Sequence, residues 1–386
     1  MESVTARETK KVKAPIRIPV CEPVLDGREE VYLLDCLKKN WISSGKFISE
    51  FEERFSHYCG AKCGVACSSG TAAIHLALAA LGIGPGDEVI VPCFTLIACA
   101  NMVILSGAKP VFVDADPKTW CLNPDAILLK LTPRTKAILA VHMYGHPCDM
   151  DRIMNLARQN GLVVIEDGAE AHGAEYKGRK VGGIGDAGCF SFYGNKMITT
   201  GEGGMVVTSR PDIAQRLRLL RNQAFEEPRF VHRHFGFNYR MSSLQAAVGL
   251  AQCENIEFKI SRKRQIAYQY HQGFKGQPDI VLPYEAPWAK NVYWMYGLVL
   301  EEGFGCSRDA VMQRLLEQGI ETRAFFYPLH RQPVYQDVSD PRFPDTSGHY
   351  PVSEKLSRSG LYLPSGLGLS KAQIAEVIQA LLDCRP

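Results

Sequence analysis

The chain has 386 residues, of which 46% are hydrophobic and 22% are charged, an ordinary composition for a globular enzyme. Its net charge of +3 is too small to indicate a nucleic-acid or membrane surface, and no apolar run approaches the roughly 20 residues that span a bilayer. The length suffices for one large domain and a smaller one.

The start of the chain and its cysteines predict where the protein works. The first residues, MESVTARETKKVK, lack the apolar segment of a signal peptide, so we expect residues 1–15 to form a mobile tail. The 13 cysteines are odd in number, and several lie in apolar runs, where a thiol behaves as a small hydrophobe. Their spacing matches no metal-ligand pattern. We therefore expect no metal site and a reducing, cytoplasmic location.

Short apolar runs alternate with helical patterns from about residue 64 to residue 209. A first strand ends near Cys67, and the expected strands after it are Glu88–Pro92, Pro110–Asp114, Ala137–Val141, Leu162–Asp167, Cys189–Tyr193 and Gly204–Ser209. The expected helices between them are Ala72–Leu81, Ile97–Leu105, Pro124–Leu131 and Met150–Asn160. Repeated strand–helix units predict an α/β fold with a mostly parallel sheet covered by helices on both faces.

Two more helices are expected after this region, at Pro211–Arg221 and Ser242–Glu257, with Ser242 as the N-cap of the second. After about residue 277 prolines become more frequent, which favours a smaller α+β domain that ends in a helix at Lys371–Asp383. The predicted division therefore places residues 16–255 in a large α/β domain and residues 256–386 in a small C-terminal domain.

A lone lysine, Lys196, lies between the two apolar runs Cys189–Tyr193 and Gly204–Ser209 and is followed by the glycine-rich turn Gly201–Gly204. If this segment is buried, the pKa of the ammonium falls, because the charged form loses hydration. The neutral amine is then a nucleophile that can form a Schiff base with an aldehyde. The alternative is an ordinary surface lysine in a loop.

Two further features lie upstream of Lys196. Asp167 ends a continuous apolar run, which predicts a carboxylate at the carboxyl end of a buried parallel strand, where ligands of open α/β sheets bind. The small residues from Cys67 to Thr71 lead into a helix, whose free N-terminal amides suit a phosphate. A lysine that can bind an aldehyde, a carboxylate that can pair with a ring nitrogen and a helix N-terminus that can bind a phosphate together predict a site for pyridoxal 5'-phosphate (PLP). Asp167 alone could equally cap its strand.

The chain resembles the DegT/DnrJ/EryC1/StrS family of PLP-dependent sugar aminotransferases from about Ile18 to its end. The resemblance is carried by WISSGKFI at Trp41–Ile48, GIGPGDEVIVP at Gly82–Pro92, EDGAEAHG at Glu166–Gly173, FSFYGNKMITTGEGGM at Phe190–Met205 and GFNYRM at Gly236–Met241. It implies the aspartate-aminotransferase fold, known as PLP fold type I. That fold is an α/β domain with a mostly parallel central sheet and a smaller C-terminal α+β domain.

The resemblance also implies roles for single residues. Lys196 would bind PLP covalently and transfer protons, Asp167 would pair with the pyridine nitrogen, and Glu170 would lie beside the ring. His172 either borders the site or only packs. The phosphate would be held by the residues that match the family's phosphate positions: Ser69, Gly70, Thr71 and Ser191. Asn238 matches a position that reaches the phosphate of a neighbouring subunit, which implies a homodimer with shared active sites.

The chain departs from the family at Leu96, where an aromatic residue usually stacks on the cofactor ring. Phe94, two residues earlier, is the candidate substitute, and the ring contact is assigned to this pair. Segments that border the sugar nucleotide in the family match Trp41, Ser43, Ser44, Tyr327 and His330. His330 could instead be a loop histidine that packs on Pro328, and Arg240 could pair with a diphosphate or with a carboxylate inside the fold.

The reaction implied by the resemblance is transfer of an amino group from L-glutamate to C4 of an NDP-4-keto-6-deoxyhexose. GDP-4-keto-6-deoxymannose is the expected acceptor, and the product would enter a glycan such as the O-antigen of lipopolysaccharide. A UDP- or dTDP-linked acceptor stays open, as does a non-catalytic binding or regulatory homologue. A dehydratase is disfavoured, since the dehydratases of the family carry His at the position of Lys196.

Overall fold

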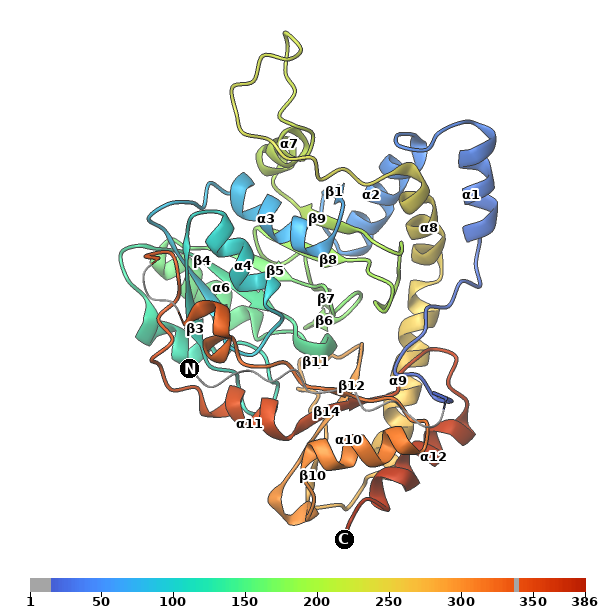
Figure 1. Ribbon diagram of the computed structural model, residues 1–386. Coiled ribbons are helices and arrows are strands. Elements are labelled where there is room, and N and C mark those ends of the chain that lie inside the picture. Colours follow the sequence, from blue (N-terminus) through green and yellow to red (C-terminus); the bar gives the residue numbers. More distant parts are fainter. Residues whose placement is uncertain (1–14, 337–339) are drawn as a thin grey trace.

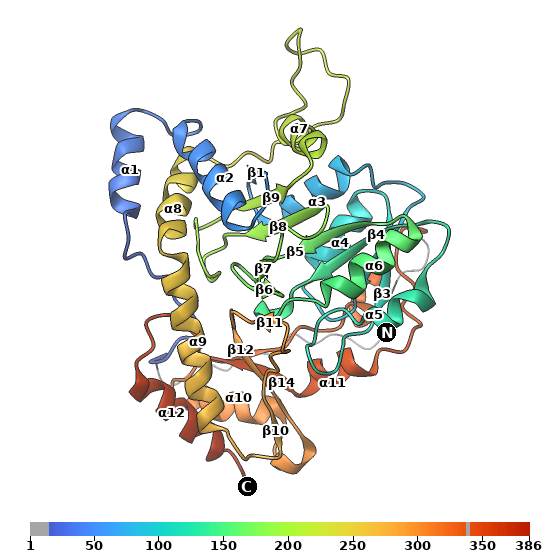
Figure 2. The ribbon, with the colours of Figure 1, turned by 180° about the vertical axis from the view of Figure 1, so that it is seen from behind.

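The computed structural model describes residues 15–336 and 340–386, so the predicted tail lies outside the described residues except for its last member, Pro15. A large central sheet forms the middle of three layers, with α3 (Gly70–Ala80) and α4 (Ala98–Leu105) on one face and α6 (Met150–Asn160) on the other (Figures 1 and 2). A smaller part, formed mainly by the C-terminal third of the chain, lies at one end of this sandwich (Figure 1). No helix within the described ranges has the length and apolar character needed to cross a membrane.

The central sheet has seven strands among the described residues, in the order β1-β9-β8-β5-β4-β2-β3. Neighbouring strands from β8 to β3 are parallel, whereas β9 runs antiparallel to both β1 and β8. The predicted mostly parallel sheet is thus confirmed. The strands span Cys63–Cys67 (β1), Glu88–Pro92 (β2), Lys109–Val113 (β3), Thr135–Val141 (β4), Val163–Asp167 (β5), Ala187–Ser191 (β8) and Gly204–Thr208 (β9).

Four helices of this part, α3, α4, α6 and α7 (Pro211–Leu220), were predicted to within two residues at each end. They span Glu29–Lys38 (α1), Lys46–Tyr58 (α2), Gly70–Ala80 (α3), Ala98–Leu105 (α4), Pro124–Ile127 (α5), Met150–Asn160 (α6), Pro211–Leu220 (α7) and Ser243–Glu254 (α8). Ser242 caps α8 in a reciprocal capping box with Gln245. The helices α1 and α2 were not predicted.

Three predicted boundaries were wrong. The helix expected to run to Glu257 ends at Glu254, because Asn255 leaves helical geometry and α9 (Ile256–Gly273) begins after it. The helix expected at Pro124–Leu131 is one α-turn followed by a 3-10 turn at Leu128–Lys130. The strand expected at Cys189–Tyr193 ends at Ser191, since the chain turns there toward Lys196.

The C-terminal part contains an antiparallel sheet of four strands in its described residues, in the order β10-β12-β14-β13. Its strands span Ile280–Val281 (β10), Tyr296–Leu300 (β12), Arg323–Ala324 (β13) and Gly360–Leu363 (β14), and its helices after α9 span Arg308–Glu317 (α10), Pro351–Ser359 (α11) and Lys371–Leu382 (α12). A third sheet joins β6 (Glu175–Tyr176) and β7 (Arg179–Lys180) to β11 (Ala289–Lys290).

The segment near the start of the described chain packs against the C-terminal part. Ile18 forms a bridge with Ile320 and belongs to the same buried apolar cluster as β12 and β14. The backbone N–H of Ser365 donates to the carbonyl of Val20 at 2.8 Å. The domain division at residue 255 stays a prediction.

Candidate active site

Three of the predicted site residues, Asp167, Glu170 and Lys196, lie together near the place where the central sheet changes its winding direction. From β2 the chain moves outward to β3, then crosses back to β4 and continues through β5 to β8. Loops that follow the carboxyl ends of such strands form the ligand-binding crevice of open α/β sheets. Asp167 ends β5, and the turn containing Tyr144 follows β4. These two positions place a carboxylate and an aromatic residue at the same edge.

Asp167 is a buried carboxylate, only 7% exposed. One carboxylate oxygen accepts from the Cys99 thiol at 3.3 Å, and the other accepts from the backbone N–H of Ala169 at 3.0 Å. No cationic side chain of the described residues lies within 4.0 Å of it. A buried charge without a cationic partner is costly. Its surroundings therefore suit a ligand that brings positive charge, such as a protonated ring nitrogen.

Lys196 lies in the short turn after β8. Its backbone N–H donates to the carbonyl of Tyr193 at 2.9 Å, which closes the turn. Its Nζ atom lies 3.9 Å from the centroid of the Trp294 ring. Burial lowers the pKa of the Lys196 amine, and the nearby carboxylates of Glu170 and Asp167 oppose this effect. The amine is thus held in an enclosed position between acids and an indole ring.

Glu170 is equally buried, and one of its oxygens accepts from the backbone N–H of Tyr144 at 2.9 Å. Burial raises the pKa of Glu170 to about 7, although the charge of Lys196 acts in the opposite direction. Tyr144 itself has a positive φ of 51°, a left-handed conformation that is rare for a bulky residue. Strain of this kind is common at functional sites. Because its pKa is about 7, the Glu170 carboxyl group changes charge near neutral pH.

The N-terminus of α3 meets β8 at the position predicted for phosphate binding. Ser69 caps the helix by accepting from the backbone N–H of Ala72 at 3.1 Å. A Cβ atom on Gly70 would lie 2.6 Å from the Cβ of Ser191, so only glycine lets the helix approach this strand so closely. Thr71 is exposed and Ser191 is half-buried. The structure thus brings the helix amides, Thr71 and Ser191 together.

Asn238 lies on the long segment between α7 and α8, which projects from the body of the protein at the top of Figure 1. Its side chain is exposed, and its backbone forms a bridge with Asn222. Arg240 is exposed too, and its guanidinium donates to the side-chain oxygen of Asn222 at 2.8 Å. Within the described chain its side-chain contact is therefore an amide rather than a carboxylate.

The pair assigned to the ring contact has two different environments. Phe94 is fully buried, with its ring centroid 5.8 Å from that of Phe325 and 6.1 Å from that of Tyr144. Leu96 is 49% exposed. Of the two, Leu96 has the side chain that is free to contact a ligand.

The residues expected to border the sugar nucleotide also lie in two different environments. Trp41, Ser43, Ser44 and Tyr327 have exposed side chains. His330 is buried, and both of its ring nitrogens are occupied: Nδ1 lies 3.0 Å from the Cys93 sulfur and Nε2 lies 2.9 Å from a Glu354 oxygen. The geometry of His330 is therefore that of a packing residue, and its ring also contacts Tyr350.

His172 is fully buried among three phenylalanine rings. The rings of Phe55, Phe190 and Phe192 lie between 5.3 and 6.0 Å from its centroid. Neither of its nitrogens has a hydrogen-bond partner within the described chain, and burial lowers its pKa to about 3. His172 is therefore neutral over the physiological pH range and packs in the core.

Sequence reasoning missed three residues that the structure places around the predicted ones. Cys99 donates to Asp167, Tyr144 donates to Glu170, and Trp294 faces Lys196. Cysteine at the start of α4 and tyrosine after β4 have no distinctive pattern in the sequence. Trp294 lies about a hundred residues after the lysine, so only the tertiary structure relates the two.

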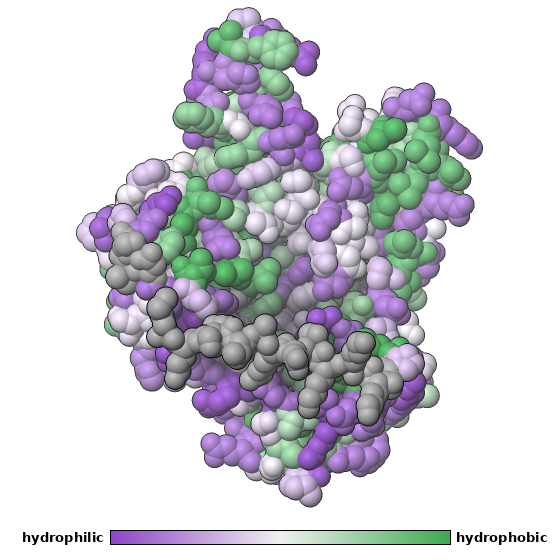
Figure 3. Space-filling model, viewed as in Figure 1, coloured by the Kyte–Doolittle hydropathy of each residue, from purple (hydrophilic) through white to green (hydrophobic). Residues whose placement is uncertain are grey.

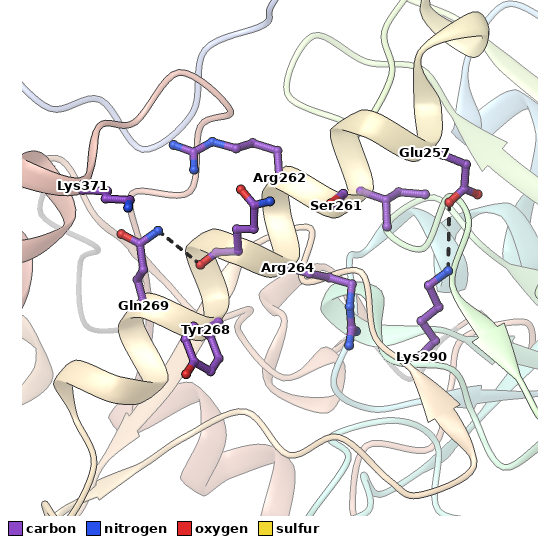
Figure 4. Close-up of a pocket in the computed structure, with 10 residues that line it drawn as sticks. Glu257, Ser261, Arg262, Arg264, Tyr268, Gln269, Lys290 and Lys371 are labelled. Atoms are coloured by element: carbon purple, nitrogen blue, oxygen red, sulfur yellow. Dashed lines mark hydrogen bonds and ion pairs between the residues drawn. The ribbon is translucent and has the colours of Figure 1, made fainter.

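A cavity of about 910 Å³ lies elsewhere, along the outer face of α9 (Figure 4). None of the predicted site residues lines it. Its arginine and lysine side chains are largely paired, for example Arg264 with Glu285 and Lys290 with Glu175. In addition, no group of three or more His, Cys, Asp or Glu residues in the described ranges could hold a metal ion.

The residues at the sheet edge fit PLP. A buried amine with a lowered pKa suits the aldehyde, the Asp167 carboxylate, which has no cationic partner among the described residues, suits the ring nitrogen, and the helix amides beside Gly70 suit the phosphate. The Asn195 side-chain oxygen, next to Lys196, is a buried acceptor without a partner among the described residues. This acceptor and the helix amides are compatible with a ligand that carries hydrogen-bond donors and a negative group.

The chain is similar to known proteins over nearly its whole length. The sequence profile of the DegT/DnrJ/EryC1/StrS aminotransferase family matches residues 23–382. GDP-perosamine synthase from Caulobacter vibrioides is 46% identical over 95% of this chain and 97% of its own length, and GDP-perosamine synthase from Escherichia coli O157:H7 is 42% identical over 94% and 97%. The crystal structure of DesV from S. venezuelae matches with a TM-score of 0.86 and 37% identity, covering 92% of this chain and 94% of that one. The chain therefore belongs to the DegT/DnrJ/EryC1/StrS family of PLP-dependent sugar aminotransferases.

Proposed function

We propose that the protein transfers an amino group from L-glutamate to C4 of GDP-4-keto-6-deoxymannose and so produces GDP-perosamine. The observation that carries the reaction type is the enclosed Lys196 amine beside the Asp167 and Glu170 carboxylates. The choice of substrate is supported by the similarity to the Caulobacter and Escherichia relatives over nearly the whole chain. The product suits the synthesis of a glycan such as the O-antigen.

Each site residue has a distinct task in this proposal. When bound, PLP supplies an electron sink that stabilises negative charge on the carbon bearing the transferred amine. The Asp167 carboxylate holds the positive charge on the ring nitrogen, and the helix amides beside Gly70, with Ser191, hold the phosphate. The neutral Lys196 amine would take up a proton from one of the two carbons that flank the transferred nitrogen and deliver it to the other. Burial lowers the pKa of this amine and so favours its neutral form.

We further propose that two copies of the chain complete each other's sites. Asn238 lies on a projecting, exposed segment that also carries the exposed Phe230 and Phe235. A second exposed apolar surface lies over α1, where Figure 3 shows hydrophobic side chains at the upper right: Val31, Leu34 and Leu37. Exposed apolar groups of this kind mark interaction surfaces. A homodimer would cover both.

The donor half of the reaction can be tested by itself. The purified, PLP-loaded protein is mixed with L-glutamate, and the visible absorbance of the cofactor and the release of 2-oxoglutarate are followed. We expect the visible band to disappear while about one equivalent of 2-oxoglutarate per site is released, and we expect the Lys196→Ala variant to do neither at a comparable rate. A protein that binds PLP but leaves glutamate unchanged would favour another donor or a non-catalytic homologue.

The acceptor is identified by a second screen. GDP-, UDP- and dTDP-linked 4-keto-6-deoxyhexoses are offered in turn with L-glutamate, and the products are separated and examined by NMR. The proposal expects the GDP-linked sugar to give the highest kcat/KM and the new amine to lie on C4. A higher kcat/KM with a UDP- or dTDP-linked sugar, or an amine on C3, would overturn the substrate but leave the aminotransferase assignment intact.

A further inference from the structure

Trp294 contacts the turn that carries Lys196, and none of the site roles predicted from the sequence involves this tryptophan. It is 4% exposed, and its indole N–H donates to the backbone carbonyl of Asn195 at 2.8 Å, the residue just before Lys196. Its ring lies 3.9 Å below the Lys196 Nζ atom. The tryptophan thus contacts both the backbone and the amine of the same short turn.

The tryptophan is itself fixed from behind. Its carbonyl accepts from the Nζ atom of Lys263 at 2.8 Å, and that buried ammonium also donates to the carbonyl of Ser365 at 2.6 Å. Its ring stacks on Tyr144, with centroids 6.3 Å apart and an interplanar angle of 26°. Tyr144 in turn donates to Glu170. A side chain restrained at this many points has little freedom to move away from the lysine.

We infer that Trp294 is a positioning residue for Lys196, fixing the backbone before the lysine through its N–H and receiving the free amine on its ring face. The protonated amine is attracted to the electron-rich face of an indole ring. The ring therefore stabilises the ammonium in a place where burial disfavours it. The inference rests on the assignment of Lys196 as the residue that binds PLP.

Other groups also act on the Lys196 amine. The carboxylates of Glu170 and Asp167 and the thiol of Cys99 face it and raise its pKa, and His172 is close enough for the lysine charge to affect the imidazole. These groups stay unchanged when only residue 294 is substituted. A shift in the titration of Lys196 on changing residue 294 therefore reports the indole.

The test uses the full-length protein freed of PLP and follows the rate of PLP uptake against pH. Uptake requires the neutral amine, so its pH midpoint reports the pKa of Lys196. We expect Trp294→Leu to lower the midpoint by roughly one unit or less, because the ring face is lost. Trp294→Phe keeps a ring face, so the midpoint should stay close to that of the parent while the plateau rate falls by up to about tenfold, because the hydrogen bond to Asn195 is lost.

The matched control is Trp120→Phe. Trp120 is as buried as Trp294, at 4% exposure, and its ring packs on Phe325 and on the edge of Tyr144 rather than on the lysine. This variant should keep both the midpoint and the plateau rate. An unchanged midpoint in Trp294→Leu, or an unchanged rate in Trp294→Phe, would overturn the inference. If the leucine variant does not fold, the phenylalanine variant still decides on the hydrogen bond.

The location of the bound PLP separates this inference from the assignment on which it rests. Borohydride reduction of the loaded protein, followed by peptide mass analysis, shows which lysine carries the cofactor. An adduct on Lys196 with no effect of residue 294 overturns the role of Trp294 alone. An adduct on another lysine overturns the role of Lys196 and the inference with it.

Discussion

At the scale of single residues, the acid beside the lysine determines how the site responds to pH. The pKa of Glu170 is raised to about 7 in the folded protein, well above the ordinary value of an unfolded glutamate. The folded state therefore holds the proton more tightly than the unfolded state between about pH 4.5 and 7. The free energy of unfolding consequently falls as the pH rises through this interval. Below it the carboxyl group is neutral in both states, and this cost disappears.

Glu170→Gln removes this titration but keeps an oxygen that can accept from Tyr144. We expect the PLP-free variant to match the parent near pH 4.5 and to be more stable at pH 8 by on the order of 2–3 kcal/mol. Urea unfolding of both proteins at several pH values measures the difference. Parallel pH profiles for parent and variant would contradict the raised pKa.

The Cys99 thiol is the second residue-scale feature, because it is the side chain that donates to the Asp167 carboxylate. Cys99→Ala removes the donor, and Cys99→Ser replaces it with a stronger one. We expect the alanine variant to bind PLP up to about tenfold more weakly, with the serine variant close to the parent. Equilibrium dialysis with PLP measures both. Equal weakening in the two variants would mean that the side chain acts by its size and not by its hydrogen bond.

At the scale of elements, the contact between α3 and β8 shapes the phosphate cradle. In Gly70→Ala the new Cβ would lie 2.6 Å from the Ser191 side chain, so the helix must move away from the strand. We expect destabilisation of about 1–3 kcal/mol and a loss of PLP affinity of at least about tenfold. Thermal unfolding and a PLP titration measure the two effects.

Gly368→Ala is the control for this substitution. A Cβ atom at Gly368 meets nothing within 4 Å, and this glycine has no left-handed φ. Stability and PLP affinity should both stay near those of the parent. If Gly70→Ala behaved like the control, the close approach of α3 to β8 would have no part in binding the phosphate.

The elements also show what could be predicted from the sequence. Strong periodic patterns located β2, α6 and the cap of α8 well, because their own residues decide burial and capping. The break at Asn255 and the early end of β8 were missed, since tertiary contacts decide them. Lys196 and Asp167 could be predicted from local motifs, whereas Trp294 and Cys99 could not. The contacts of Trp294 and Cys99 join segments that are distant in the chain, so no local sequence pattern indicates them.

At the scale of the whole molecule, the proposed shared sites make a prediction about mixed dimers. Lys196→Ala and Asn238→Ala each damage every site of a homodimer if Asn238 serves the neighbouring subunit. In a mixed dimer one site loses both residues while the other keeps both. We therefore expect two poorly active proteins to regain activity when they are unfolded and refolded together, up to about a quarter of the parent value for random pairing.

Activity of the mixture is compared with that of each variant refolded alone, and analytical ultracentrifugation gives the subunit number. A mixture no more active than the mean of its parts would contradict shared sites. A monomeric protein with full activity would contradict the dimer altogether.

The contact between Trp294 and Lys196 also determines when the protein can acquire its cofactor during synthesis. The lysine leaves the ribosome about a hundred residues before the tryptophan that restrains it. A nascent chain that has just exposed the lysine still lacks β9 of the central sheet, the indole of Trp294, and the strands β12 and β14 that follow it. We expect cofactor capture to occur late, near chain release. Nascent chains stalled before residue 294 should therefore hold far less PLP than those stalled after the C-terminal sheet has emerged.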